Sequence, residues 1–127
     1  MLFWKRAKKI LIIDDDRTLL RRLSIHLEKN KDLQVIVSDN ATEGLIAAQK
    51  SRPNLIILDW MLPDIQGIDL LTTLKHSKQT KKIPVIMLTG RNKIGNIEDA
   101  FERGADDYMV KPFSLQKLAE KSFFLMK

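Results

Sequence analysis

Short runs of apolar residues alternate with longer amphipathic segments from residue 10 almost to the end of the chain. An uninterrupted run of roughly four to eight apolar residues is typical of a parallel strand that is buried on both faces. An amphipathic segment is typical of a helix that covers such a sheet, and five strand and helix pairs fit the sequence. The sequence therefore predicts an α/β fold, a doubly wound five-stranded parallel sheet with helices on both faces.

The boundaries of these elements follow from the apolar runs and from local stop signals. The predicted strands are 10–13, 33–37, 55–58, 85–88 and 108–110, and the predicted helices are about 16–29, 40–51, 68–76, 96–103 and 114 almost to the terminus. Asn40 with Glu43 three residues later forms a capping-box pattern. Gly104 is the residue type expected where the chain turns left-handed past a helix end, and Ser114 is a plausible N-cap.

Polar residues follow four of the predicted strands directly. They are Asp14, Asp15 and Asp16 after the first strand, Asp59 after the third, Thr89 after the fourth and Lys111 after the fifth. In open parallel sheets, ligands bind outside the carboxyl ends of the strands. Three carboxylates held together repel one another unless a cation neutralises them, and Mg²⁺ binds one or two carboxylates together with phosphate oxygens. The sequence therefore predicts a magnesium-dependent phosphoryl-transfer site at this edge.

Each of these residues also has a purely structural interpretation. The acidic run could be a solvated strand end or a helix N-cap, Thr89 with Gly90 could be a turn, and Lys111 before Pro112 could be a surface lysine. Asp59 is harder to explain in this way, because a charge directly after a buried strand is costly without partners. The combination, in this order and spaced one per strand and helix unit, favours a site.

Four segments, residues 10–16, 55–67, 85–90 and 104–113, resemble the signature segments of response-regulator receiver domains. The resemblance covers essentially the whole chain. It implies a flavodoxin-like (βα)5 fold with strand order 2-1-3-4-5. It also implies that the protein is a signalling switch rather than an enzyme that releases a product.

The resemblance further implies a phosphoacceptor and a set of metal ligands. Asp59 is expected to accept the phosphoryl group and to bind Mg²⁺. Asp14 and Asp15 are expected to bind the metal directly or through water, and Met61 to contribute only its backbone carbonyl.

The same resemblance implies the residues that read the phosphorylated state. Thr89 is expected to hydrogen-bond the phosphoryl group, and Lys111 to pair with it electrostatically. We expect Thr89 to move toward the phosphoryl group and Tyr108 to turn inward as an aromatic switch. The peptide bond between Lys111 and Pro112 is cis in similar domains.

Partners and lifetime follow from the resemblance as well. A sensor histidine kinase or a phosphotransfer protein would supply the phosphoryl group in two-component signalling or a phosphorelay, and the domain would catalyse its own phosphorylation and dephosphorylation. A downstream protein would bind the face of the fourth helix, fifth strand and fifth helix, and homodimer formation stays open. Met61 and Arg91 would flank the phosphoryl group and slow its loss.

The net charge of +6 is concentrated in two segments. Residues 1–9 and residues 75–82 each hold four basic residues and no acid, and removing these eight from the 22 leaves 14 basic against 16 acidic residues. We therefore expect a basic N-terminal extension, residues 1–9, and a receiver domain, residues 10–127. No helix combines arginine with aromatic residues, so direct nucleic-acid binding is not favoured, although the basic loop could guide an acidic partner.

The chain contains no cysteine, which excludes disulfides and thiolate chemistry and fits a reducing cytosol. No apolar run approaches the roughly 20 residues that span a bilayer, and the N-terminus lacks the order of a signal peptide. The sequence therefore predicts a cytoplasmic protein that does not bind a membrane.

Three other functions fit parts of the pattern. A phosphatase with an aspartyl-phosphate intermediate would share the metal and the nucleophile, but its usual second acid is replaced by Met61. A flavodoxin-like FMN binder would need a hydroxyl-rich and glycine-rich loop after the first strand, where three acids stand instead. A basic nucleic-acid module would have to rely on the two lysine-rich segments.

Overall fold

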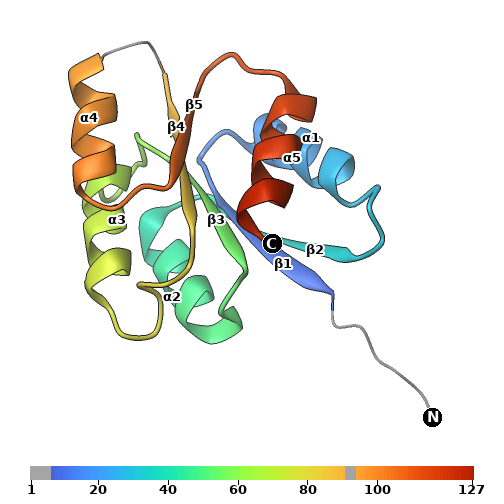
Figure 1. Cartoon of the computed structure of the whole chain (residues 1–127), viewed down its shortest axis with the longest axis horizontal. Helices are drawn as coiled ribbons and strands as arrows, with labels where there is room; N and C mark the ends of the chain where they lie inside the picture. The colour runs from blue at the N-terminus through green and yellow to red at the C-terminus, as the bar shows by residue number, and fades with distance from the viewer. Residues whose placement is uncertain (1–6, 91–93) are drawn as a thin grey trace.

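The computed structural model describes residues 7–90 and 94–127. Five strands alternate with five helices in this part of the chain (Figure 1). The strands are β1 (Lys8–Ile13), β2 (Leu33–Ser38), β3 (Leu55–Asp59), β4 (Val85–Thr89) and β5 (Asp107–Val110). The helices are α1 (Arg17–Leu27), α2 (Ala41–Ser51), α3 (Gly67–His76), α4 (Ile94–Glu102) and α5 (Leu115–Leu125). All neighbouring strands are parallel, in the order β2-β1-β3-β4-β5, which confirms the predicted fold.

The first strand begins earlier than the apolar run indicates. Lys8 and Lys9 pair with the first two residues of β2, and the backbone N–H of Lys8 donates to the carbonyl of Asp32 at 2.9 Å. These two lysines therefore belong to the sheet and not to the extension in which we placed them. Residues 1–6 of that extension lie outside the described residues.

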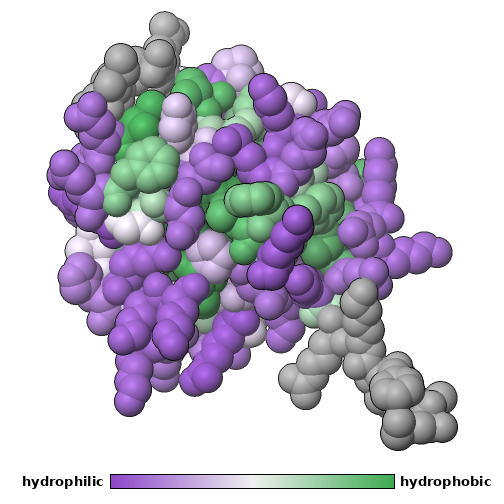
Figure 2. All heavy atoms as spheres, in the orientation of Figure 1, coloured by the Kyte–Doolittle hydropathy of each residue, from purple (hydrophilic) through white to green (hydrophobic). Residues whose placement is uncertain are grey.

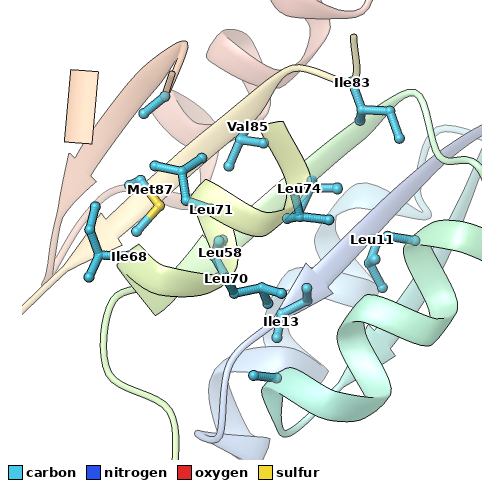
Figure 3. Packing of buried hydrophobic residues seen from close by; sticks show 14 of the residues in the cluster. Leu11, Ile13, Leu58, Ile68, Leu70, Leu71, Leu74, Ile83, Val85 and Met87 are labelled. Carbon is cyan, nitrogen blue, oxygen red and sulfur yellow. The ribbon is translucent and has the colours of Figure 1, made fainter. Parts of the chain in front are cut away.

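The sheet has a hydrophobic core on each face. On one face, alternate residues of β1, β3 and β4 pack against α2, α3 and α4, and on the other face the intervening residues pack against α1 and α5. β3 and β4 are buried along their whole length, as uniformly apolar runs predict. Figure 3 shows the first of these cores, with Leu11, Ile13, Leu58, Ile68, Leu70, Leu71, Leu74, Ile83, Val85 and Met87 labelled.

The predicted helix caps are present. The side chains of Asp16, Asn40 and Ser114 accept hydrogen bonds from backbone N–H groups in the first turns of α1, α2 and α5. Gly104, just past the end of α4, has a φ of 108°, a left-handed conformation that glycine adopts without steric cost. These residues fix where the helices begin and end, and so position the loops that carry the site.

Hydrophilic side chains cover most of the face drawn in Figure 2, and hydrophobic side chains gather over α5 and along α4. The exposed large apolar residues of the described chain include Phe101 on α4 and Phe123 and Phe124 on α5. None of the helices formed by the described residues combines the length and the apolar character that crossing a membrane requires.

Candidate functional site

The predicted site residues meet at the carboxyl edge of the sheet. Asp14 and Asp15 follow β1, Asp59 is the last residue of β3, Thr89 is the last residue of β4 and Lys111 follows β5. Carboxylate oxygens of the three aspartates lie within 4.8 Å of one another. The ammonium of Lys111 lies 2.8 Å from Asp14 and 3.4 Å from Asp59. The fold therefore brings residues from three strand ends into one cluster, and Thr89 ends the strand that lies between β3 and β5.

The two aspartates after β1 have different surroundings. Asp14 is fully buried, and its carboxylate accepts hydrogen bonds from the backbone N–H of Asp16 at 2.9 Å and from Lys111 at 2.8 Å. Its own backbone N–H donates to the carbonyl of Ser38, which continues the hydrogen bonding between β1 and β2. Asp15 is exposed. Asp14 is thus held rigidly inside the site, whereas Asp15 faces solvent at its rim.

Asp59 is a buried carboxylate that lies close to other charged groups. It is only 6% exposed, and burial, followed by the negative charge of Asp14, raises the pKa of its carboxyl to about 6, against the opposing effect of Lys111. Burial alone lowers the pKa of Lys111, but its hydrogen bond to Asp14 and the charges of Asp59 and Asp14 together raise it above the usual value. The cluster therefore holds excess negative charge that a bound cation would offset.

The donor set fits a magnesium ion. Mg²⁺ prefers oxygen ligands and keeps several waters, so two or three carboxylates at an open edge suit it better than a closed cage. Met61, in the loop after β3, is 66% exposed, and no hydrogen bond to its carbonyl is found among the described residues. Its backbone oxygen is therefore free to act as a ligand.

The two residues expected to switch lie on neighbouring strands. The hydroxyl of Thr89 is buried and has no hydrogen-bond partner among the described residues, an arrangement that is costly unless a ligand completes it. Tyr108 is half-buried, and its ring lies edge-on to that of Phe101 on α4, with centroids 5.8 Å apart.

The peptide bond between Lys111 and Pro112 is cis, as expected. Arg91, expected to flank the site, lies outside the described residues.

The sequence assigned no role to Gly67, which shapes the loop under the site. A Cβ atom on this residue would lie 1.8 Å from the carbonyl oxygen of Asp59, and its N–H donates to the carbonyl of Trp60 at 2.6 Å. Only glycine fits so close to the backbone of the strand end. The turn-forming segment from Pro63 to Gly67 signals a tight loop, but not this approach to Asp59.

Comparisons with known proteins agree with this geometry. A family model described as response regulator receiver domain matches residues 10–122. The chain is 37% identical to the phosphate regulon transcriptional regulatory protein PhoB of Pseudomonas aeruginosa, over 91% of this chain and 50% of that protein. It is 40% identical to the transcriptional regulatory protein SrrA of Staphylococcus aureus, over 85% of this chain and 43% of that protein. The chain thus spans about half the length of these curated relatives, or less.

Solved structures show the same likeness. The Francisella response regulator 1452 receiver domain is 31% identical, with a TM-score of 0.86 over 94% of this chain and 96% of that chain. The BeF3-activated N-terminal receiver domain of Klebsiella pneumoniae RstA is 25% identical, with a TM-score of 0.86 over 94% of this chain and 99% of that chain.

The fold and the site together define a doubly wound α/β domain with an acidic cluster at the carboxyl edge of its sheet. The chain belongs to the response regulator receiver domain family of two-component signalling.

Proposed function

We propose that Asp59 accepts a phosphoryl group from a phosphohistidine of a sensor histidine kinase or a phosphotransfer protein, and that phosphorylation switches the binding of a downstream partner. The observation that carries this proposal is the meeting of three aspartates and one lysine, with Lys111 3.4 Å from the buried Asp59. The receiver domain would include the whole of β1 from Lys8 onward, preceded by a basic extension shorter than residues 1–9.

In the proposed reaction, an oxygen of the ionised Asp59 carboxylate attacks phosphorus in line with the phosphorus–nitrogen bond of the phosphohistidine. That bond breaks, the imidazole leaves with the bonding electron pair and takes up a proton, and an acyl phosphate forms on Asp59. The ammonium of Lys111 is close enough to Asp59 to neutralise charge on the transferred group. A hollow of about 410 Å³, lined by Asp16, Lys111 and Phe113 among others, opens beside Lys111.

Asp14, Asp15, Asp59 and the carbonyl of Met61 would hold Mg²⁺. When bound, the ion would neutralise charge on the phosphoryl oxygens and favour the ionised form of Asp59. Water later cleaves the acyl phosphate, so the domain would catalyse both its own phosphorylation and its own dephosphorylation.

The switch would start at the buried hydroxyl of Thr89. This group has an unused donor, and a phosphoryl oxygen on Asp59, one strand away, would supply the acceptor. Movement of Thr89 leaves space next to β5 that the ring of Tyr108 would enter, which breaks its edge-on contact with Phe101 of α4. The face of α4, β5 and α5, where hydrophobic side chains gather in Figure 2, would then change shape for a downstream protein or a second copy of the chain.

We place this activity in the cytoplasm, because a chain without cysteine forms no disulfides and so fits a reducing compartment. Direct nucleic-acid binding by this domain is not part of the proposal, because the described residues offer no helix that interleaves arginine with aromatic side chains.

The test is incubation with Mg²⁺ and a small phosphodonor, followed by intact-mass measurement. We expect a gain of one phosphoryl group that is absent in Asp59→Asn and in protein treated with a chelator. Asp32→Asn is the matched control, because Asp32 is an exposed aspartate at the opposite end of the sheet. Equal phosphoryl gain in Asp59→Asn and in the parent protein would overturn the proposal.

A further inference from the structure

Asp64 joins the loop between β3 and α3 to the first turn of α2. Its Oδ1 accepts a hydrogen bond from the backbone N–H of Ala41 at 2.9 Å, and its Oδ2 accepts from the backbone N–H and the hydroxyl of Thr42 at 2.9 and 2.8 Å. The bonds from Ala41 and Thr42 hold the pKa of the Asp64 carboxyl well below its usual range, and they do so more than the local bond from Ile65. The contact is therefore tertiary rather than a local turn.

The start of α2 explains why these donors converge on one carboxylate. The first N–H groups of an α-helix have no acceptor within the helix. The N-cap residue Asn40 accepts from the N–H of Glu43 at 2.8 Å, and Asp64 accepts from the two N–H groups that precede it. A negative charge at this end of a helix is also favoured by the helix dipole. Asp64 thus completes the cap of α2 from another segment.

The other end of this contact is the loop that carries Met61. The loop closes where the N–H of Gly67 donates to the carbonyl of Trp60, and the side chain of Leu62, 7% exposed, packs in the core. Its tip, from Pro63 to Gln66, is exposed. Among the described residues, Asp64 is the loop residue whose side chain hydrogen-bonds to another part of the protein.

Asp64 and Met61 are separated by two residues, so an anchor at Asp64 limits where the backbone of Met61 can lie. Three residues of chain span at most roughly 10 Å, and Pro63 between them has a fixed φ that limits how the segment can bend. With Leu62 anchored in the core and Asp64 anchored on α2, the peptide groups from Met61 onward are held at both ends.

We propose that Asp64 is a positioning residue of the metal site, which uses its contact with the first turn of α2 to aim the backbone carbonyl of Met61 at the carboxylates of Asp14 and Asp59. This inference rests on the proposed function, since the carbonyl is a ligand only if the site binds Mg²⁺. Groups that orient a metal ligand typically change metal affinity by about 10- to 100-fold, and we expect the lower end for a residue that acts through the backbone.

The experiment measures Mg²⁺ affinity from the fluorescence of Trp60, which directly follows Asp59, in a Trp4→Phe background so that Trp60 is the single tryptophan. Asp64→Ala is compared with Asn40→Ala, which removes the other side-chain cap of α2 and leaves the loop untouched. Both changes should lower the melting temperature of the metal-free protein to a similar extent. We expect Asp64→Ala to weaken Mg²⁺ binding about 10-fold, and Asn40→Ala to change it less than about 2-fold.

Two further variants grade the effect. Thr42→Val removes the hydroxyl donor but keeps the backbone donor, and Asp64→Asn keeps one carbonyl acceptor. The Mg²⁺ affinity of both variants should therefore lie between that of the parent and that of Asp64→Ala. If Asp64→Ala does not fold, Asp64→Asn replaces it in the comparison of Mg²⁺ affinity with Asn40→Ala.

Equal Mg²⁺ affinity in Asp64→Ala and Asn40→Ala would overturn the inference, because Asp64 would then only stabilise α2. If the parent protein binds Mg²⁺ and gains a phosphoryl group while Asp64→Ala binds Mg²⁺ as tightly, only the role of Asp64 fails. A parent protein that binds no Mg²⁺ would overturn both the proposed function and this inference.

Discussion

Lys111 donates a hydrogen bond to the fully buried carboxylate of Asp14 at 2.8 Å, a shorter contact than its 3.4 Å approach to Asp59. The ammonium therefore compensates chiefly for the negative charge of Asp14, and less for that of the phosphoacceptor Asp59. A lysine and a divalent cation stabilise the same negative charge and so compete for it. A phosphoryl group on Asp59 would offer Lys111 a second partner, and this exchange underlies the first two predictions.

Lys111→Ala should bind Mg²⁺ more tightly than the parent when unphosphorylated, by roughly 10-fold, because one positive charge leaves the site. Without Mg²⁺ the variant should melt at a lower temperature, since Asp14 is left buried without its ammonium partner, and Mg²⁺ should restore much of the loss. Isothermal titration and thermal melts measure both effects. Lys117→Ala, which removes the same charge from an exposed position on α5, is the control. Unchanged Mg²⁺ affinity in Lys111→Ala would show that the lysine and the ion do not compete for the same negative charge.

Lys111→Ala should still accept a phosphoryl group but should not switch. Its ammonium matters most for the phosphorylated state, where it meets new negative charge. Tyr108 is the single tyrosine of the chain, so a fluorotyrosine label reports its surroundings by NMR without ambiguity. We expect its resonance to shift on phosphorylation in the parent and to stay in place in the phosphorylated variant. The same shift in both proteins would rule out this role for Lys111.

Asp59→Asn should stabilise the metal-free protein at neutral pH. The folded state raises the pKa of Asp59 to about 6, above the unfolded value of about 3.9, so the folded state binds more protons between these values and the free energy of unfolding falls as pH rises through them. The gain from Asp59→Asn should therefore be on the order of 2 kcal/mol above pH 6 and should vanish below about pH 4. Urea titrations with a chelator present, at several pH values, measure it; a gain that does not depend on pH would contradict the burial argument.

Asp15→Ala and Asp14→Ala should separate metal binding from stability. Asp15 is exposed and carries like charge beside the other two aspartates, so its removal should abolish Mg²⁺ binding and phosphorylation while stability holds or rises. Asp14 is buried and accepts bonds from Lys111 and Asp16, so Asp14→Ala should cost about 3 kcal/mol or more. Denaturant titration is the measurement, and a loss of cooperativity in Asp15→Ala would show that Asp15 is structural.

The sequence predicted the strands and the cluster at their ends for one physical reason. Strands buried on both faces are uniformly apolar, so a polar residue such as Asp59 marks both the strand end and the sheet edge. Contacts that depend on tertiary packing have no comparable signal in the sequence. The bond of Asp64 to Ala41 joins residues 23 positions apart, and the preference of Lys111 for Asp14 depends on the small difference between contacts of 2.8 and 3.4 Å. The polar start of β1 at Lys8 likewise depends on pairing with β2.

The lifetime of the phosphorylated state should depend on the side chain of Met61. It is two residues after Asp59, 66% exposed and apolar, so it can cover the approach of water but cannot orient a water molecule for attack. Met61→Asn supplies a donor and an acceptor at the same place, and we expect phosphoryl loss in Mg²⁺ to become several-fold faster after the donor is removed.

Met61→Leu is the matched control for this change, because leucine keeps the apolar character and similar volume and should decay at the parent rate. Loss is followed by intact mass over time. Because Met61 would bind Mg²⁺ only through its backbone, both variants should retain parent affinity for the ion, which separates an effect on water from an effect on the metal. If Met61→Asn loses its phosphoryl group at the parent rate, the side chain does not shield Asp59, and hydrolysis is limited by other groups around the acyl phosphate.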